Sequence, residues 1–187
     1  MKTLAAGEAN VHFYQGDASE LLIKEVLPRA RYENYRRALC LLDPYGLHLD
    51  WQAVAASGRM KSVEVFLNFP IMHMNRNVLR HDPSTVSLEE IEKMNRFWGD
   101  ESWRTAYRKI SKGLFEPIDE KSTNADIVRA YKERLRTAAG FKYVPDPMPM
   151  RNSSGAVVYY LFFASPNETG RKIVQSIFDS YRNRGAV

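Results

Sequence analysis

The most constraining feature of this sequence is a pair of strand-like segments with one amphipathic segment between them. Ala38–Leu42 is a continuous apolar run that ends at Asp43-Pro44-Tyr45-Gly46, and Ser62–Asn68 alternates apolar and polar residues. Continuous apolar runs are typical of strands that a parallel sheet buries on both faces. Because His48–Met60 has the apolar spacing of a helix, the three segments predict a βαβ unit with a right-handed crossover.

An earlier strand and helix extend this pattern toward the N-terminus. Val11–Tyr14 reads as a short strand that stops at Gln15-Gly16-Asp17, and Ser19–Arg37 is helical in composition with a bend or break at Pro28. The first 70 residues therefore predict a βαβαβ core with a parallel sheet.

The remainder of the chain predicts a helical insert followed by a return to the sheet. Residues 71–122 form the insert, with a loop expected over Gly113–Lys121, and residues 123–187 complete a single domain. The expected elements of that last part are a helix at 123–139, strands at 141–144 (or on to 150) and 156–164, and a helix at 168–181. Prolines at 145, 147 and 149 remove backbone donors from one side, which suits an edge strand.

Composition limits the class of protein. The chain has 187 residues, a net charge of +5 and one cysteine, Cys40. One cysteine excludes a disulfide framework and a multi-thiolate metal site, and the histidines lack ligand spacing. The apolar runs are far shorter than the roughly 20 residues of a membrane span. We therefore expect a cytoplasmic, single-domain protein without metal or membrane contacts.

Polar residues follow the expected parallel strands and mark a candidate site. Ligands of open α/β sheets bind at the carboxyl ends of such strands. Asp43 could accept a hydrogen bond from an amine, Tyr45 could stack on a planar base, and Gly46 allows a positive φ or a close backbone approach. Asn68 could orient an amide or hydroxyl. The alternatives are a plain β-turn at residues 43–46 and a strand-end role for Asn68.

Asp17 and two further groups of residues each have both a functional and a structural interpretation. Asp17 could accept from a ligand amine or could cap the following helix. Four arginines either contact phosphate groups or lie on solvated helix faces: Arg76, Arg80, Arg104 and Arg108. Four aromatic residues either form a protein-binding hot spot or pack the insert on the sheet: Phe97, Trp98, Trp103 and Tyr107.

Five segments of the chain resemble the three-Cys-motif partner protein (TcmP) family. In chain order these are VHFYQGDASELL, ALCLLDPYGLHLDW, VEVFLNFPIMHMNR, FWGDESWR and PMRNSSGAVVYYLFFAS. The resemblance implies an α/β fold with a three-layer, Rossmann-like methyltransferase sheet, a helical insert and a C-terminal antiparallel hairpin. The full sheet order of that fold is 3-2-1-4-5-7-6. Since the chain begins just before the third strand, we expect an N-terminally truncated sheet with an open edge.

The resemblance also implies site residues and partners. In the fold, an acidic residue after the third strand contacts the adenine of S-adenosylmethionine, which matches Asp17 with its neighbours Gly16 and Ala18. A motif after the fourth strand holds the target amine, and Asp43-Pro44-Tyr45-Gly46 resembles it without the second proline. We expect a methyltransferase-like protein that acts on a nucleic-acid or nucleotide base and is inactive alone, because the cofactor-binding glycine-rich loop is missing.

The alternatives are a non-catalytic partner of the three-cysteine, radical-SAM-like protein of phage or mobile elements, and a nucleic-acid-binding module. An oligomer through the open sheet edge is a further expectation.

Overall fold

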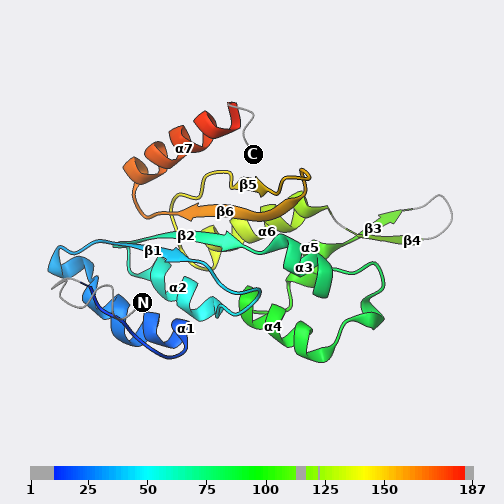
Figure 1. Ribbon diagram of the computed structural model, residues 1–187, viewed down its shortest axis with the longest axis horizontal. Coiled ribbons are helices and arrows are strands. Elements are labelled where there is room, and N and C mark those ends of the chain that lie inside the picture. Colours follow the sequence, from blue (N-terminus) through cyan, green and yellow to red (C-terminus); the bar gives the residue numbers. More distant parts are fainter. Residues whose placement is uncertain (1–10, 113–116, 122, 184–187) are drawn as a thin grey trace.

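A computed structural model describes residues 11–112, 117–121 and 123–183, and within them a mixed sheet has the strand order β1-β2-β6-β5 (Figure 1). β1 and β2 are parallel, and β6 is antiparallel to both of its neighbours. The strands are β1 (Ala38–Leu42), β2 (Val63–Phe69), β5 (Met148–Arg151) and β6 (Val157–Ala164). The expected α/β class, the parallel pair and the C-terminal antiparallel hairpin are thus confirmed.

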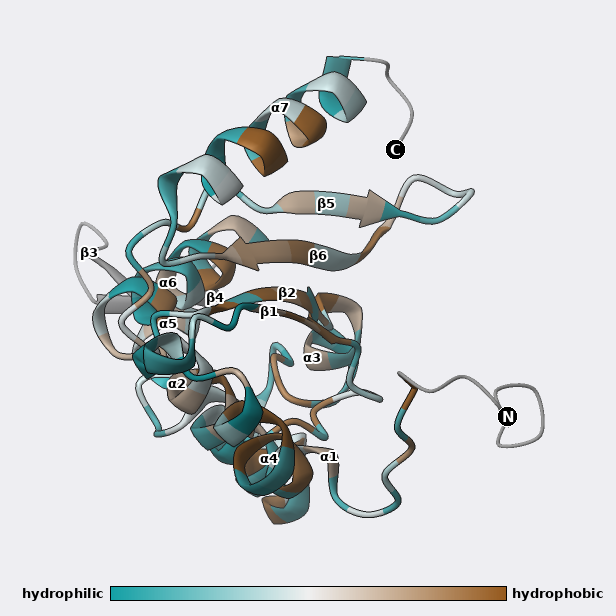
Figure 2. Cartoon of the chain, turned by 90° about the vertical axis from the view of Figure 1, so that its left-hand side faces the viewer, coloured by the Kyte–Doolittle hydropathy of each residue, from teal (hydrophilic) through white to brown (hydrophobic). Residues whose placement is uncertain are grey.

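Helices lie on both faces of this sheet. α7 packs on one face, and α2, α4 and α6 lie on the other (Figures 1 and 2). The helices in the described part of the chain are α1 (Ala18–Leu21), α2 (Trp51–Arg59), α3 (Ile71–Asn77), α4 (Leu88–Trp98), α5 (Trp103–Tyr107), α6 (Asn124–Thr137) and α7 (Glu168–Asn183).

The main core lies between the sheet and α2, α4 and α6, and it is rich in aromatic rings. Tyr131 of α6 is its centre: the ring of Phe69 lies 4.7 Å away, that of Trp98 5.2 Å and that of Phe162 5.5 Å. A smaller core lies under α7, where Phe163 packs with Phe178 and other apolar residues. The sheet is therefore covered more extensively on one face than on the other.

Capping residues fix where the helices begin and end. Ser87 accepts the N–H of Glu90 at the start of α4, and Gly99 ends that helix with a φ of +99°. A Cβ at Gly99 would lie 2.3 Å from the Trp51 ring, so the close approach of α4 and α2 needs glycine there. The expected start of a helix at residue 123 is confirmed.

Three expected elements differ in the structure. Val11–Tyr14 is not a strand, because no described strand pairs with it and a lone exposed strand has nothing to stabilise it. The expected helix at 19–37 is reduced to α1, a π turn at Leu22–Val26 and short turns beyond it. Of the expected loop at 113–121, residues 113–116 lie outside the described residues, and Pro117–Lys121 is instead strand β4, which pairs antiparallel with β3 (Arg108–Lys112).

The C-terminal strands agree with the sequence in position and in role. β6 is a central strand of the sheet, and β5 is an edge strand that contains Pro149. Before it, Tyr143 forms only an isolated bridge with Ser165. The strand thus lies at the later part of the expected 141–150 segment.

Candidate functional site

Asp43 and Asn68 meet at the carboxyl ends of the two parallel strands. Asn68 Nδ2 donates a hydrogen bond to Asp43 Oδ1 at 2.7 Å, although 25 residues separate them. Both line a cavity of about 410 Å³ together with Pro44, Gly46 and Pro70. The expected convergence is therefore met by the residues after β1 and β2, but not by Gly16-Asp17. The pair offers carboxylate and amide oxygens, and the remaining amide hydrogen, to a ligand.

α3 and β6 complete this cavity with residues that the strand ends do not supply. Met72, His73 and Arg76 come from α3, and Val158 and Tyr159 come from β6. The sequence offers no metal-binding reason to expect His73 here, because the histidines lack metal-ligand spacing. A usable signal was present, since α3 begins directly after Pro70 and its first turn must therefore lie over the end of β2.

His73 is held in place by close contacts. Gly46 has a φ of +59°, and a Cβ there would lie 2.7 Å from His73 Cε1, so the expected positive φ and close approach at Gly46 are both confirmed. On the other side of the ring, Nε2 lies 3.1 Å from Asn77 Nδ2 and 3.6 Å from Glu90 Oε2. The imidazole is thus a fixed wall of the cavity.

Tyr45 is the exposed member of the Asp-Pro-Tyr-Gly segment. Its side chain is 88% exposed, and its ring lies 6.2 Å from that of His48. It does not line the cavity, but it lies in the turn between Pro44 and Gly46, which do. An exposed ring in this place is free to stack on a planar group that approaches the cavity.

Asp17 lies at a different place. Its Oδ1 accepts the N–H of Glu20 at 2.9 Å, so Asp17 is the N-cap of α1, Ala18 is the first residue of that helix, and Gly16 precedes the cap. Asp17 lines a hollow of about 280 Å³ with Ser19, Asp50, Glu89 and others, separate from the Asp43 cavity. The structure therefore does not bring Gly16, Asp17 and Ala18 to the strand-end residues.

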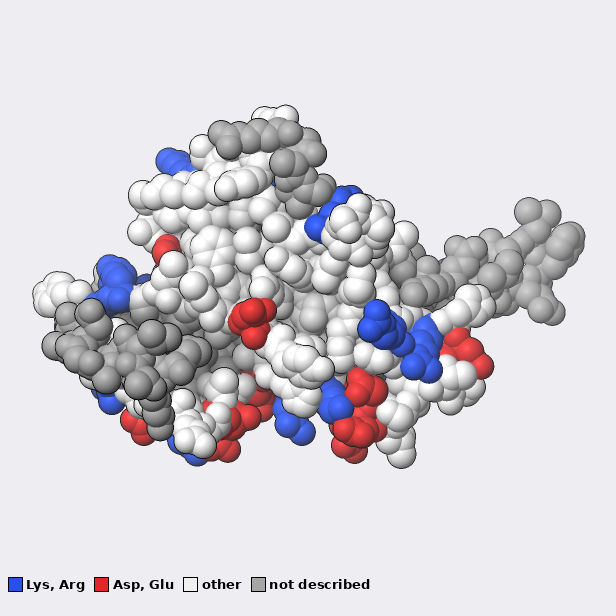
Figure 3. Space-filling model, viewed as in Figure 1, with Lys and Arg blue, Asp and Glu red and all other residues white. Residues whose placement is uncertain are grey.

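The four arginines are not one surface. Arg76 lines the cavity, whereas Arg80 donates to the carbonyl oxygens of Arg76 and Thr85. Arg104 lies 4.6 Å over the Trp103 ring. Arg108 begins β3, and its side chain lies outside the described part of the structure. On the face in Figure 3, basic and acidic residues alternate in small groups.

The aromatic residues of the insert pack inward. Phe97, Trp98, Trp103 and Tyr107 are all buried. Of the two interpretations of this group, packing of the insert is confirmed and an exposed hot spot made of these side chains is wrong. A protein partner, if it binds, must use another surface.

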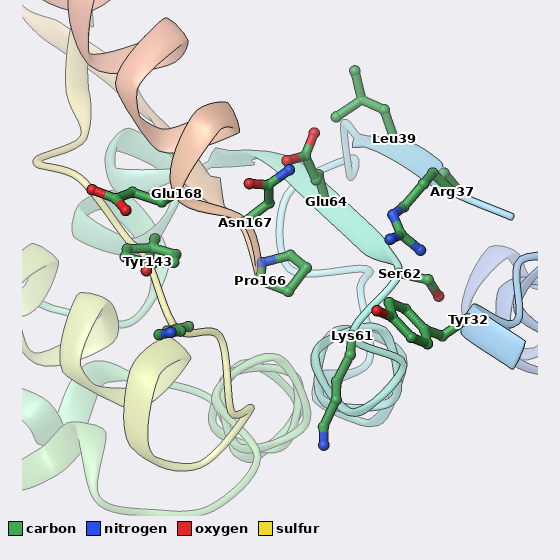
Figure 4. Close-up of a pocket in the computed structure, with 12 residues that line it drawn as sticks. Tyr32, Arg37, Leu39, Lys61, Ser62, Glu64, Tyr143, Pro166, Asn167 and Glu168 are labelled. Atoms are coloured by element: carbon green, nitrogen blue, oxygen red, sulfur yellow. The ribbon is translucent and has the colours of Figure 1, made fainter. Parts of the chain in front are cut away.

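A larger cavity, of about 640 Å³, opens at the other end of the parallel strands (Figure 4). Arg37, Lys61 and Lys142 line it, but Figure 4 shows Lys61 extending away from Glu64 and Pro166. Glu64 accepts a hydrogen bond from Ser165 at 2.7 Å. The charged side chains that line this larger cavity do not converge on one point, so the cavity is a weaker candidate site than the Asp43 cavity.

The described residues contain neither a metal centre nor a membrane-spanning helix. No group of His, Cys, Asp or Glu in the described residues could hold a metal ion, and none of the described helices has the length and apolarity to span a bilayer. Comparison with family models, with curated proteins and with solved structures found no match for the chain. Any function must therefore be argued from the cavity itself.

Proposed function

We propose that the Asp43 cavity binds the exocyclic amine of a nucleobase. The observation that carries this proposal is the hydrogen-bonded pair of Asp43 and Asn68 at the mouth of a cavity formed by strand ends. An ionised carboxylate accepts strongly from an amine, and Asn68 holds that carboxylate in one orientation.

The residues around the pair suit the rest of a nucleotide. The exposed ring of Tyr45 supplies a stacking surface next to the turn. Arg76, also exposed, lines the cavity and supplies a cation for a phosphate group. Base, amine and phosphate would thus each meet a residue of the matching chemistry.

We further propose that the chain is a methyltransferase-like protein of the TcmP type, in which this cavity holds the target base. The order β1-β2-β6-β5, with β6 alone reversed, supports this because it corresponds to the 4-5-7-6 part of the methyltransferase sheet. In that proposal Asp43 accepts from the amine that would be methylated.

The described residues do not fit S-adenosylmethionine. Asp17, the expected adenine contact, uses its carboxylate to cap α1 and faces a separate hollow whose lining mixes acidic residues such as Asp50 and Glu89 with Lys93 and Arg96. No step through the cofactor follows from these residues, and a cofactor remains a proposal for a more complete assembly.

The amine proposal is tested with pairs of nucleosides that differ in one group. Adenosine carries the amine and inosine carries a carbonyl in its place. A hydrogen bond to a charged acceptor contributes about 1.5 kcal/mol or more, so we expect about tenfold tighter binding of adenosine. Calorimetric titration measures both affinities. Asp43→Asn should remove the preference, whereas Glu133→Gln, on the exposed side of α6, should leave it intact.

Two results would count against the proposal: equal affinities for adenosine and inosine, or a preference that survives Asp43→Asn. A separate titration with S-adenosylmethionine tests the methyltransferase part. If adenosine binds and S-adenosylmethionine does not, the chain by itself is a base-binding module and not a complete methyltransferase.

A further inference from the structure

The outer side of β1 is an open sheet edge in the described part of the chain. Ala38 donates its N–H to the carbonyl oxygen of Ser62, next to β2. In a parallel strand the backbone N–H and C=O groups of successive residues point alternately to the two neighbouring strands. Since Ala38 points toward β2, the backbone groups of Leu39 and Leu41 point away from β2, into the open edge. Such outward groups are a template for another strand.

The leucine side chains at this edge are also exposed. Leu41 is 72% exposed and Leu39 53%, both on the α7 face of the sheet. Beside them is a hollow of about 410 Å³ with Leu41, Phe66 and Leu161 in its lining. Figure 3 shows a largely uncharged surface between β1 and α7. An apolar open edge of this kind binds another strand unless charges or prolines block it.

The residues of this edge have a self-complementary order. Leu39 and Leu41 share one face of β1, and Arg37 and Asp43 directly flank the two ends of that strand, so these four residues in chain order are called the stripe. The stripe is basic at one end, apolar in the middle and acidic at the other end. Two antiparallel copies would set the basic end of each against the acidic end of the other.

We propose that β1 pairs with β1 of a second copy of this chain, antiparallel and about a twofold axis at Cys40. In this register Leu39 lies opposite the partner's Leu41, and these are the residues whose backbone groups point outward. Arg37 lies opposite the partner's Asp43, and this opposite-charge pair occurs twice. Both side chains are exposed. In the single chain Arg37 lies 4.5 Å over the Tyr32 ring and Asp43 accepts from Asn68, so forming the ion pair requires Arg37 to leave that ring and Asp43 to share its carboxylate.

Charge selects this arrangement over a parallel one. A parallel pair of the same strands would set Arg37 against the partner's Arg37 and Asp43 against the partner's Asp43, and like charges directly opposite are destabilising. The antiparallel pair also brings the partner's Arg37 to the mouth of the Asp43 cavity. The inference rests on the open edge of β1, but it shares Asp43 with the proposed amine site, so the molar mass and the cross-links test the dimer separately from the nucleoside titrations.

The first test is the molar mass in solution, measured by sedimentation equilibrium up to about 100 µM protein. We expect twice the 21.6 kDa mass of the chain. Leu41→Lys places a charge in the apolar middle of the stripe and should restore the single-chain mass. The matched control is Leu88→Lys, since Leu88 is 78% exposed on α4 and should leave the mass doubled.

The second test fixes the register by cross-linking in a Cys40→Ala background. Opposite residues of a hydrogen-bonded antiparallel pair have Cα atoms about 5.5 Å apart, within disulfide reach. Leu39→Cys and Leu41→Cys should therefore cross-link when the two variants are mixed and oxidised. Neither should cross-link by itself, because residue 39 of one copy lies roughly 8 Å from residue 39 of the other.

A single-chain mass over the whole concentration range would overturn the proposal. So would a doubled mass that Leu41→Lys leaves unchanged, since the copies would then meet through another surface. Cross-linking of Leu39→Cys with itself, as efficient as that of the mixture, would reject the register at Cys40.

Discussion

Replacing Tyr131 by phenylalanine should stabilise the protein. The hydroxyl of Tyr131 is fully buried, and no described residue gives it a hydrogen-bond partner. The same burial raises the pKa of this phenol well above its ordinary value. A buried polar group without a partner costs about 1–3 kcal/mol. Since Tyr131→Phe keeps the ring contacts with Phe69 and Phe97, we expect the free energy of unfolding to rise by about 1–2 kcal/mol.

Urea denaturation at neutral pH measures this change, with two other tyrosines as controls. The hydroxyl of Tyr107 donates to the carbonyl oxygen of Arg80, so Tyr107→Phe should lose about 1 kcal/mol. Tyr35 is 96% exposed, so Tyr35→Phe should change nothing. A loss of stability in Tyr131→Phe, similar to that in Tyr107→Phe, would refute the reasoning because it would show that the Tyr131 hydroxyl has a partner.

Three further changes test other parts of the fold. Gly58→Ala would place a Cβ 2.1 Å from a main-chain carbonyl oxygen just beyond α6, so thermal denaturation should show a loss of about 1–3 kcal/mol. Ser165→Ala removes the part-buried hydrogen bond to Glu64, so the free energy of unfolding measured in urea should fall by about 1–2 kcal/mol. Partial burial raises the pKa of Asp100, but hydrogen bonds, including one from Arg134, outweigh it and lower the pKa below its ordinary 3.8. The stability that Asp100 contributes should therefore be present at neutral pH and be lost as the pH falls through that lowered pKa. Urea curves at several pH values should show wild type and Asp100→Asn converging there.

The sheet was predictable where the local pattern reports burial. Ala38–Leu42 and Ser62–Asn68 match β1 and β2 to within a residue or so, because residues 40, 63, 65 and 67 face the core. Burial of β1 on both faces was wrong, since Leu39 and Leu41 are exposed. Val11–Tyr14 has an equally strand-like composition, but a strand also needs a neighbour. Composition carries no information about that neighbour, so this expectation was wrong.

The candidate site was predictable in part for a similar reason. Asp43 and Asn68 follow parallel strands, and such strands end at one edge of the sheet, so their meeting follows from topology. His73 and Tyr159 reach the cavity through the angle of α3 and the register of β6. The register of β6 is not visible in the order of residues, whereas a helix that starts directly after Pro70 already indicates that His73 lies near the end of β2.

The prolines in and just before β5 limit how many copies of the chain could join through their sheet edges. Pro149 lies in the edge strand opposite to β1, and Pro147 immediately precedes that strand. A strand that lacks backbone donors is a poor template for further pairing. If the copies join through β1, both outer ends of the combined sheet carry this proline strand. Growth then stops at a closed pair, and the open edge does not lead to a fibre.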